Sequence, residues 1–127
     1  MTERQLLDPT EAVMDTSVLL EFLDMVGPEG PELLRSIADT YAVETPPLLI
    51  ALGMALERGD VVAATRFAHR LKGSCLSIGA SRLAASCAAV EDACIRGTPP
   101  PADVYYSLRQ HFAATNDALR SFIHGLS

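Results

Sequence analysis

The sequence predicts an all-α protein, on the evidence of its composition and of its helix-stop signals. Hydrophobic residues make up 49% of the 127 residues and aromatic residues only 6%, tryptophan is absent, and alanine and leucine recur throughout. This balance favours packed helices over sheets. Glycine or proline separates the segments of helical periodicity, most clearly in "TPPP" at 98–101. The length fits one domain, so we expect residues 1–127 to form a single domain in which residues 1–14 are a loosely ordered N-terminal segment.

The first half of the chain predicts a short helix and then a long, interrupted one. Either Asp15 or Thr16 can cap the short helix, which ends at residues 27–28. The long helical pattern covers about 31–58, and the two prolines at 46–47 predict a kink or break there, whether as one bent helix or as two. The positions of this pattern that we expect in the core are Leu33, Ile37, Tyr41, Leu48, Leu52 and Leu56.

The second half predicts three further helices. Asp60 is a suitable N-cap for a helix over 61–78, which ends at Gly79, and the next helix covers about 81–97. The last helix follows the proline loop and covers about 102–123. The apolar residues on or near one face of this last helix are Val104, Leu108, Phe112, Leu119 and Phe122.

The charge of the chain favours protein partners. The formal net charge of −6 repels nucleic acid and anionic lipid, so we expect neither nucleic-acid nor membrane binding. No apolar run approaches the roughly 18 residues that a membrane span needs, and the start "MTERQLLDPTEA" lacks the pattern of a secretion signal. We therefore expect a cytoplasmic protein.

The three cysteines are expected to be free thiols in the core. Cys75, Cys87 and Cys94 form an odd set without CxxC spacing, which in a reducing compartment argues against disulfides. Cys87 and Cys94 share a helix face with Leu83 and Val90. Small buried hydrophobic side chains are the favoured interpretation, and metal or redox chemistry is the alternative.

The segment "AHRLKGSCLSIGA", residues 68–80, places a histidine on the solvent side of its helix. The apolar residues spaced 4, 3, 4 and 3 apart form one seam, which consists of Ala64, Ala68, Leu71, Cys75 and Ile78. His69 lies about 150° from the centre of this seam on a helix of 3.6 residues per turn. It is therefore not a core histidine, and it is either an ordinary surface residue or a functional one.

The neighbours of His69 favour a functional role. Lys72 and Gly73 follow at i+3 and i+4, so both are adjacent to His69 on the helix surface, and Leu76 is an apolar residue on the same wet side. The ammonium of Lys72 can offset negative charge that arrives at the imidazole. Glycine inside a helix costs roughly 1 kcal/mol relative to alanine, and we infer that Gly73 is there to give a partner surface access to His69.

The segment "HRLKGSCLSIGA" resembles the signature of the histidine-containing phosphotransfer (HPt) family, in which x-L-K-G-[SA] follows a histidine. The similarity extends to "ALERGD" before that helix, to "RLAASCAAVEDACIRG" after it and to "PELLRSIADTYAVETPPLL" upstream, so it covers roughly residues 33–97. Cys75, where the family often has a small residue, and the double proline are mild departures.

The resemblance implies both a fold and a reaction. The fold is an antiparallel four-helix bundle with an additional short N-terminal helix. In the family, the residue that matches His69 is the phosphoacceptor, the one that matches Lys72 stabilises the phosphoryl group, and the glycine that matches Gly73 makes room for the receiver. The implied function is that of a phosphorelay intermediate, which accepts a phosphoryl group from a receiver-domain aspartate or a kinase and passes it to a response-regulator receiver domain.

The implied partners are a response-regulator receiver domain and a sensor or hybrid histidine kinase, and we expect the chain itself to be a monomer. No P-loop or other phosphate cradle occurs in the sequence, so we expect a phosphorylated carrier rather than an enzyme with its own nucleotide site. We expect no metal or cofactor on this chain, because the receiver would supply Mg²⁺.

Residues around His69 are candidates for partner binding together with Gly73 and Leu76. Arg66 and Arg70 flank the histidine, where they suit steering of a partner. Ser74 can bond phosphate or its own helix. Glu91 matches a frequent glutamate of the family, and its place about 65° from its helix seam allows either a docking role or a solvated boundary position.

Two other classes of function compete with this interpretation. One is a helical interaction module that binds a receiver or kinase without carrying phosphate, which loss of His69, Lys72 or Gly73 would favour, and none of them is lost. The other is a metal-binding bundle, which needs ExxH-like spacing on facing helices, and the sequence lacks this pattern. His111 and His124 lie alone in the last helix, where we expect surface or boundary roles.

Overall fold

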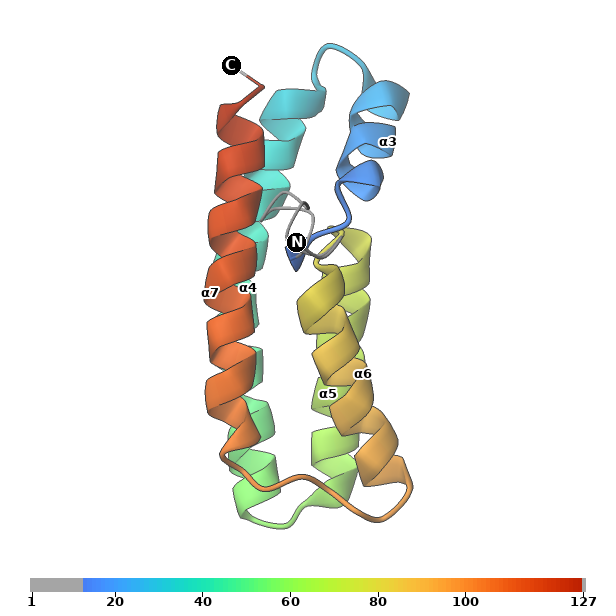
Figure 1. Cartoon of the computed structure of the whole chain (residues 1–127), viewed down its shortest axis with the longest axis vertical. Helices are drawn as coiled ribbons and strands as arrows, with labels where there is room; N and C mark the ends of the chain where they lie inside the picture. The colour runs from blue at the N-terminus through green and yellow to red at the C-terminus, as the bar shows by residue number, and fades with distance from the viewer. Residues whose placement is uncertain (1–12, 127) are drawn as a thin grey trace, which may run out of the picture.

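The computed structural model describes residues 13–126, and the helices of this part form an elongated bundle without a strand (Figure 1). The chain runs through α3 (Thr16–Val26), α4 (Gly30–Glu57), α5 (Val61–Ser77), α6 (Ser81–Ile95) and α7 (Val104–His124). The four longer helices form the bundle, with α4 and α7 on one side and α5 and α6 on the other, while the short α3 packs on α4. The all-α class and the bundle with an additional N-terminal helix are confirmed. None of the described helices is long and apolar enough to span a membrane.

The predicted helix boundaries are confirmed to within two or three residues, for identifiable local reasons. The side chain of Asp15 accepts a hydrogen bond from the amide of Ser17, and that of Asp60 accepts one from the amide of Ala63, so each acts as an N-cap. Gly79 follows α5 with φ +77°, a left-handed conformation that favours glycine. An added Cβ at Gly79 would lie 2.6 Å from the carbonyl oxygen of Asp15, so glycine also lets the start of α3 approach the α5–α6 turn.

The double proline does not break α4, which continues as one helix through Pro46 and Pro47. Proline lacks an amide hydrogen, so the carbonyls of Ala42 and Val43, four residues earlier, lose their partners in the helix. Val43 is exposed, which places its carbonyl on a wet part of the helix where water can replace the lost bond. Of the two alternatives for residues 31–58, the structure therefore shows the single helix.

The predicted core face of α4 is partly wrong. Leu33 and Ile37 are 45% and 41% exposed, while Leu34 and Ala38 are buried. Tyr41 and Leu52 are buried as expected, and Leu48 and Leu56 are partly buried against the core. Apolar residues occur at neighbouring positions of this helix, so periodicity alone admits two faces about 100° apart. The observed seam consists of Leu34, Ala38, Tyr41, Thr45, Leu49, Leu52 and Ala55.

The seams of the other helices agree with the prediction. All five residues of the α5 seam are at most 3% exposed, and Leu83, Cys87, Val90 and Cys94 of α6 are buried. In α7, Leu108 and Leu119 are buried, and Val104, Phe112 and Phe122 are partly buried against the core.

The expectation for residues 1–14 falls mostly outside the described residues, which begin at residue 13. Val13 and Met14 do not fit it, because both are buried in the core and Met14 is only 1% exposed. The hydroxyl of Ser81 donates a hydrogen bond to the carbonyl of Val13, which ties this segment to the start of α6.

Candidate functional site

His69 lies on the outer face of α5, as the seam predicts. Ala68 and Leu71 on the opposite face are fully buried, whereas the side chain of His69 is 68% exposed. Lys72 lies one turn further along α5, and Glu91 comes from α6, which is the helix that packs most extensively against α5. The imidazole is therefore held by a packed pair of helices and remains open to a partner.

Glu91 joins His69 and Lys72 into one charged cluster. Its Oε2 lies 2.6 Å from Nδ1 of His69, and its Oε1 lies 2.6 Å from Nζ of Lys72. The side chain of Glu91 is only 13% exposed and that of Lys72 is 29% exposed. One carboxylate therefore holds the ring and the ammonium at once, and the histidine is the exposed member of the three.

The contact with Glu91 selects the tautomer of His69. A carboxylate can only accept hydrogen bonds, so the Nδ1 nitrogen must carry the hydrogen and donate it. In the neutral ring the other nitrogen, Nε2, then has the free lone pair. The ring nitrogen that is free for nucleophilic attack is consequently the one that Glu91 does not touch.

Lys72 keeps Glu91 in its charged form. The hydrogen bond from Lys72 is the largest cause that lowers the pKa of the Glu91 carboxyl below its ordinary value of 4.5, and the hydrogen bond from His69 adds to it. Desolvation acts in the opposite direction and is outweighed. The carboxylate is therefore ionised at neutral pH and suited to stabilise positive charge on the imidazole.

Gly73 leaves the surface beside His69 open. A Cβ built at Gly73 meets no atom within 4 Å outside its own stretch of helix, so the glycine is not required by packing within this chain. Leu76, one turn from Lys72 and Gly73, is 56% exposed. The histidine thus lies beside a gap and an apolar side chain, which together form a surface that a second protein can approach closely.

Comparison with known proteins identifies relatives of this chain. The family model of the Hpt domain matches residues 21–122. The chain belongs to the Hpt domain family. The fold is also similar to the crystal structure of histidine-containing phosphotransfer protein B (HptB) from Pseudomonas aeruginosa PAO1, with a TM-score of 0.75, 26% sequence identity, and coverage of 88% of this chain and 95% of that chain. A comparison with curated proteins finds no match.

Membership of the family establishes the class of function. Hpt domains are phosphotransfer carriers that interact with receiver domains and kinases, and this chain has a histidine phosphotransfer role in a phosphorelay. Neither comparison assigns a role to an individual residue of this chain. The residue roles therefore rest on the geometry of the cluster.

The remaining candidate residues of this Hpt domain lie on the other flank of α5. Arg70 and Ser74 line a recess of about 350 Å³ together with Phe22 of α3 and Ile37 of α4. Arg66 is exposed one turn before Arg70. Among the described residues the Ser74 hydroxyl makes no back-bond to its helix, whereas the hydroxyl of Ser77 donates to the carbonyls of Gly73 and Ser74. Arg70 and Ser74 thus extend the exposed surface toward α4, away from Glu91.

The cysteines of the domain are free and buried, as predicted. Burial raises the pKa of Cys94, and a hydrogen bond with Cys75 together with burial raises that of Cys87. The hydroxyl of Tyr41 lies 3.6 Å from the sulfur of Cys75, which links α4 to α5 inside the core. The hydrogen bond with Cys87, outweighing burial, lowers the pKa of Cys75. All three buried thiols act as small packing side chains. Within the described residues, no group of three or more acidic, histidine or cysteine side chains could hold a metal ion.

The other histidines lie on α7, apart from this cluster. His111 bonds through Nδ1 to the hydroxyl of Ser86 at 2.9 Å, and desolvation together with Arg82 lowers its pKa. His111 is partly buried and therefore occupies a boundary position, in line with the prediction. His124 is exposed at the edge of a separate recess between α4 and α7.

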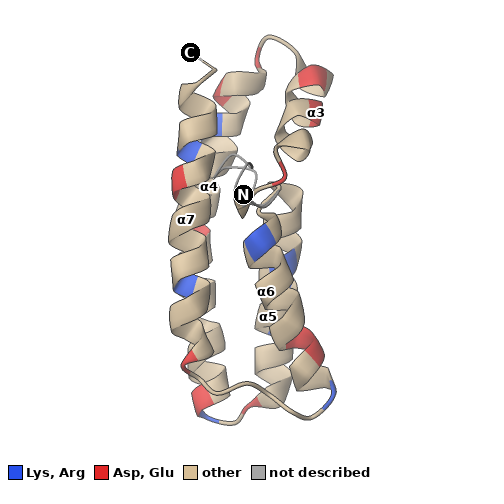
Figure 2. Cartoon of the chain, viewed as in Figure 1, with Lys and Arg blue, Asp and Glu red and all other residues tan. Residues whose placement is uncertain are grey.

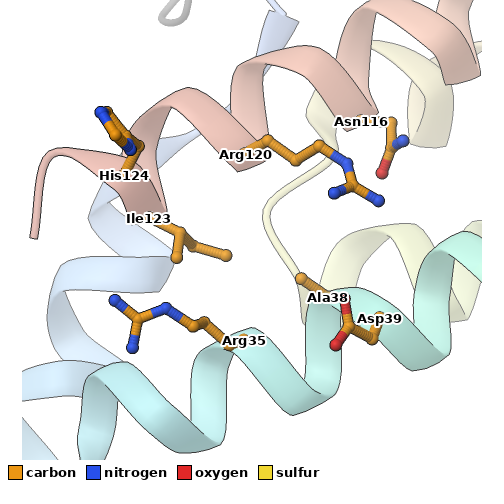
Figure 3. Close-up of a pocket in the computed structure, with 7 residues that line it drawn as sticks. All are labelled: Arg35, Ala38, Asp39, Asn116, Arg120, Ile123 and His124. Carbon is orange, nitrogen blue, oxygen red and sulfur yellow. The ribbon is translucent and has the colours of Figure 1, made fainter. Parts of the chain in front are cut away.

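That recess has a volume of about 270 Å³ and is shown in Figure 3. Its basic side chains are Arg35, Arg120 and His124. In Figure 3, the Arg120 side chain extends toward Asn116. Arg35 and the His124 ring lie on the far side of Ile123 from Arg120. The three basic groups do not converge on one point, and none of them belongs to α5 or α6. The recess is therefore no part of the His69 cluster.

Glu91 is the site residue whose position the sequence did not resolve. The angle on α6 correctly placed it at a boundary, but its bonds to His69 and Lys72 depend on how closely α6 packs on α5. The available signal was the alanine- and cysteine-rich seam of the two helices, because small residues allow close approach. The glutamate for which the sequence allows either a docking role or a solvated position thus contacts the histidine itself.

The pairing of Glu91 predicts a pH dependence of stability. A carboxyl whose pKa is lowered on folding stabilises the protein above its ordinary pKa of 4.5, and this contribution is lost as the pH falls through the lower folded-state value. We expect Glu91→Gln to lower the melting temperature by about 3 °C near pH 7 and to have little effect near pH 3. Thermal unfolding of both proteins across this range measures the difference. Glu21→Gln, an exposed change on α3, is the matched control, and an equal loss at both pH values would contradict the ionic role of Glu91.

Proposed function

We propose that His69 is the residue that accepts the phosphoryl group, from a receiver-domain aspartate or a kinase, and passes it to a response-regulator receiver domain. The observation that carries this proposal is the contact between Nδ1 of His69 and the Glu91 carboxylate, which leaves Nε2 exposed with a free lone pair. Neither His111 nor His124 shows a pairing with a carboxylate among the described residues.

The transfer step follows from this arrangement. Nε2 of His69 attacks the phosphorus of an aspartyl phosphate, the N–P bond forms, and the bond from phosphorus to the aspartate oxygen breaks, so that the aspartate leaves as a carboxylate. The imidazole then carries positive charge, while its hydrogen stays on Nδ1 and remains hydrogen-bonded to the Glu91 carboxylate. The reverse sequence on a second receiver returns the histidine to its neutral form.

Charge around the ring supports both directions of transfer. The Glu91 carboxylate stabilises the positive ring of the phosphorylated state, and Lys72 provides a nearby ammonium for the phosphoryl oxygens. Phosphoryl transfer asks mainly for alignment and for stabilisation of charge. A packed pair of helices that links the imidazole to a carboxylate and, through it, to an ammonium supports both.

The partner supplies what remains. We propose that the receiver brings its own acidic pocket with Mg²⁺, that this chain binds no metal or cofactor, and that it acts as a monomeric carrier rather than as an enzyme with a nucleotide site. The gap at Gly73, the exposed Leu76 and the flanking Arg66, Arg70 and Ser74 form the proposed docking surface. The three free thiols support a reducing, cytoplasmic setting.

The direct test of the proposed function is phosphotransfer to a His69 variant. We expect the purified chain to take up radiolabelled phosphate from cognate kinases or receiver domains of its organism, in a form that is acid-labile and alkali-stable. His69→Gln should abolish this label and leave helicity unchanged, whereas His124→Gln, a change of the same kind on α7, should retain it. A label that survives in the His69 variant would contradict the assignment, and binding of a receiver without any label on the parent chain would favour the interaction module.

Substitutions at Gly73 test the access of a partner to His69 separately from the stability of the domain. Gly73→Ala should stabilise the domain by up to about 1 kcal/mol through helix propensity, because the new methyl group meets no atom within 4 Å outside its own stretch of helix. Gly73→Gln should keep much of this gain but slow phosphotransfer at least about tenfold, because the longer side chain lies where the partner must pack. Thermal unfolding and transfer rates of the same proteins measure both effects. Parent-like transfer by Gly73→Gln would show that the glycine has another purpose.

A further inference from the structure

An apolar groove lies between the end of α4 and the start of α7, outside the His69 cluster. Its volume is about 430 Å³. The side chains that form it are Ile50, Met54, Tyr105 and Tyr106, with Glu57 and Asp103 among them. These residues come from the side of the bundle that α4 and α7 form, whereas His69 and Glu91 belong to α5 and α6 (Figure 1).

Three of the four apolar side chains of this groove are largely exposed, while Tyr105 packs against the core. Ile50, Met54 and Tyr106 are 48%, 51% and 64% exposed. On α4, Ile50, Met54 and Glu57 are spaced four and three residues apart and share one face, while the neighbouring Leu49 and Leu52 are buried. Adjacent exposed apolar side chains are unfavourable in water, and such patches mark surfaces that another molecule covers.

The floor of the groove is built by close packing. A Cβ at Gly53 would lie 3.3 Å from the Cβ and Cδ1 atoms of Tyr105, so glycine at this position lets Tyr105 lie directly on the α4 backbone. The rings of Tyr105 and Tyr106 meet edge to face, with their centres 5.5 Å apart. Rigid aromatic walls and an adaptable methionine are features of residues that anchor protein partners.

The charge of the groove is negative. Glu57 and Asp103 are exposed, and neither carboxylate has a cationic partner among the described residues. The nearest basic residue on α7, Arg109, lines the adjoining recess together with Asp117 instead. Figure 2 shows acidic positions at this end of α4 and α7 and a basic position directly after α4, where Arg58 follows Glu57 without lining the groove. An occupant of the groove must therefore combine apolar side chains with positive charge.

We propose that this groove binds a basic amphipathic helix of a partner protein. The segment from Ile50 to Glu57 spans about 10 Å along α4, or two helical turns, which matches apolar anchors at i, i+3 and i+4 or i+7 of a bound helix. Lysine or arginine side chains beside these anchors reach Glu57 and Asp103. Because α5 and α6 do not contribute to the groove, the partner can stay bound while a receiver occupies His69.

The test uses the full chain and a defined probe. The probe is a helix-forming peptide with leucine at i, i+4 and i+7 and lysine at the flanking positions, titrated into the ¹⁵N-labelled protein by NMR. We expect saturable shifts confined to residues 50–57 and 102–106. Tyr106→Ala should weaken binding about tenfold, and the combined change Glu57→Gln and Asp103→Asn about fivefold.

Matched controls separate this site from general attraction to an acidic protein. The combined change Glu21→Gln and Asp24→Asn on α3 removes the same charge elsewhere, and Val62→Ala shortens an exposed apolar side chain of α5; both should leave binding unchanged. A peptide with glutamate in place of lysine should not bind. Shifts outside the groove, equal binding of both peptides, or no saturable shifts would each overturn the proposal. None of these outcomes depends on phosphate transfer, so the result is independent of the role of His69.

Discussion

The site depends on one carboxylate shared by two side chains. Glu91 accepts a hydrogen bond from Nδ1 of His69 and another from Lys72, both at 2.6 Å. The first contact determines which ring nitrogen is free, and the second keeps the carboxylate charged by lowering its pKa. An exposed histidine on a helix would otherwise rotate freely and exchange tautomers. In the proposed mechanism, the contact with Glu91 holds the ring in one orientation and one tautomer, with Nε2 free for attack.

The contact between Glu91 and His69 depends on the packing of α5 on α6. Their facing seams contain small side chains, among them Ala64, Ala68, Ala84 and Cys87, which are at most 3% exposed. Small residues let two helices approach closely, so that a glutamate on one can reach a histidine on the other. The caps at Asp15 and Asp60 and the tight turn at Gly79 determine where the helices begin and end. Stability and site geometry therefore rest on the same interface.

Local sequence signals predicted most of the fold, whereas the contacts between side chains of different helices could not be predicted from the sequence. The narrow seam of α5 specified both the buried face and the outward direction of His69, because only one face of that helix is apolar. In α4, adjacent apolar residues admitted two faces, and Leu33 and Ile37 proved exposed. The double proline was ambiguous because the cost of two missing bonds depends on whether water reaches the free carbonyls. Glu91 could be placed at a boundary but not in contact with His69, since that requires the spacing of two helices.

The most direct test is an NMR measurement of the tautomer of neutral His69 and of the ring nitrogen that carries the phosphoryl group after transfer. Long-range ¹H–¹⁵N spectra of the parent protein should show neutral His69 with its hydrogen on Nδ1, and the phosphorylated protein should carry phosphate on Nε2. Glu91→Ala should give a mixture of tautomers without loss of the fold. Hydrogen on Nε2 in the parent protein, or phosphate on Nδ1, would contradict the claim that Glu91 directs the chemistry of His69.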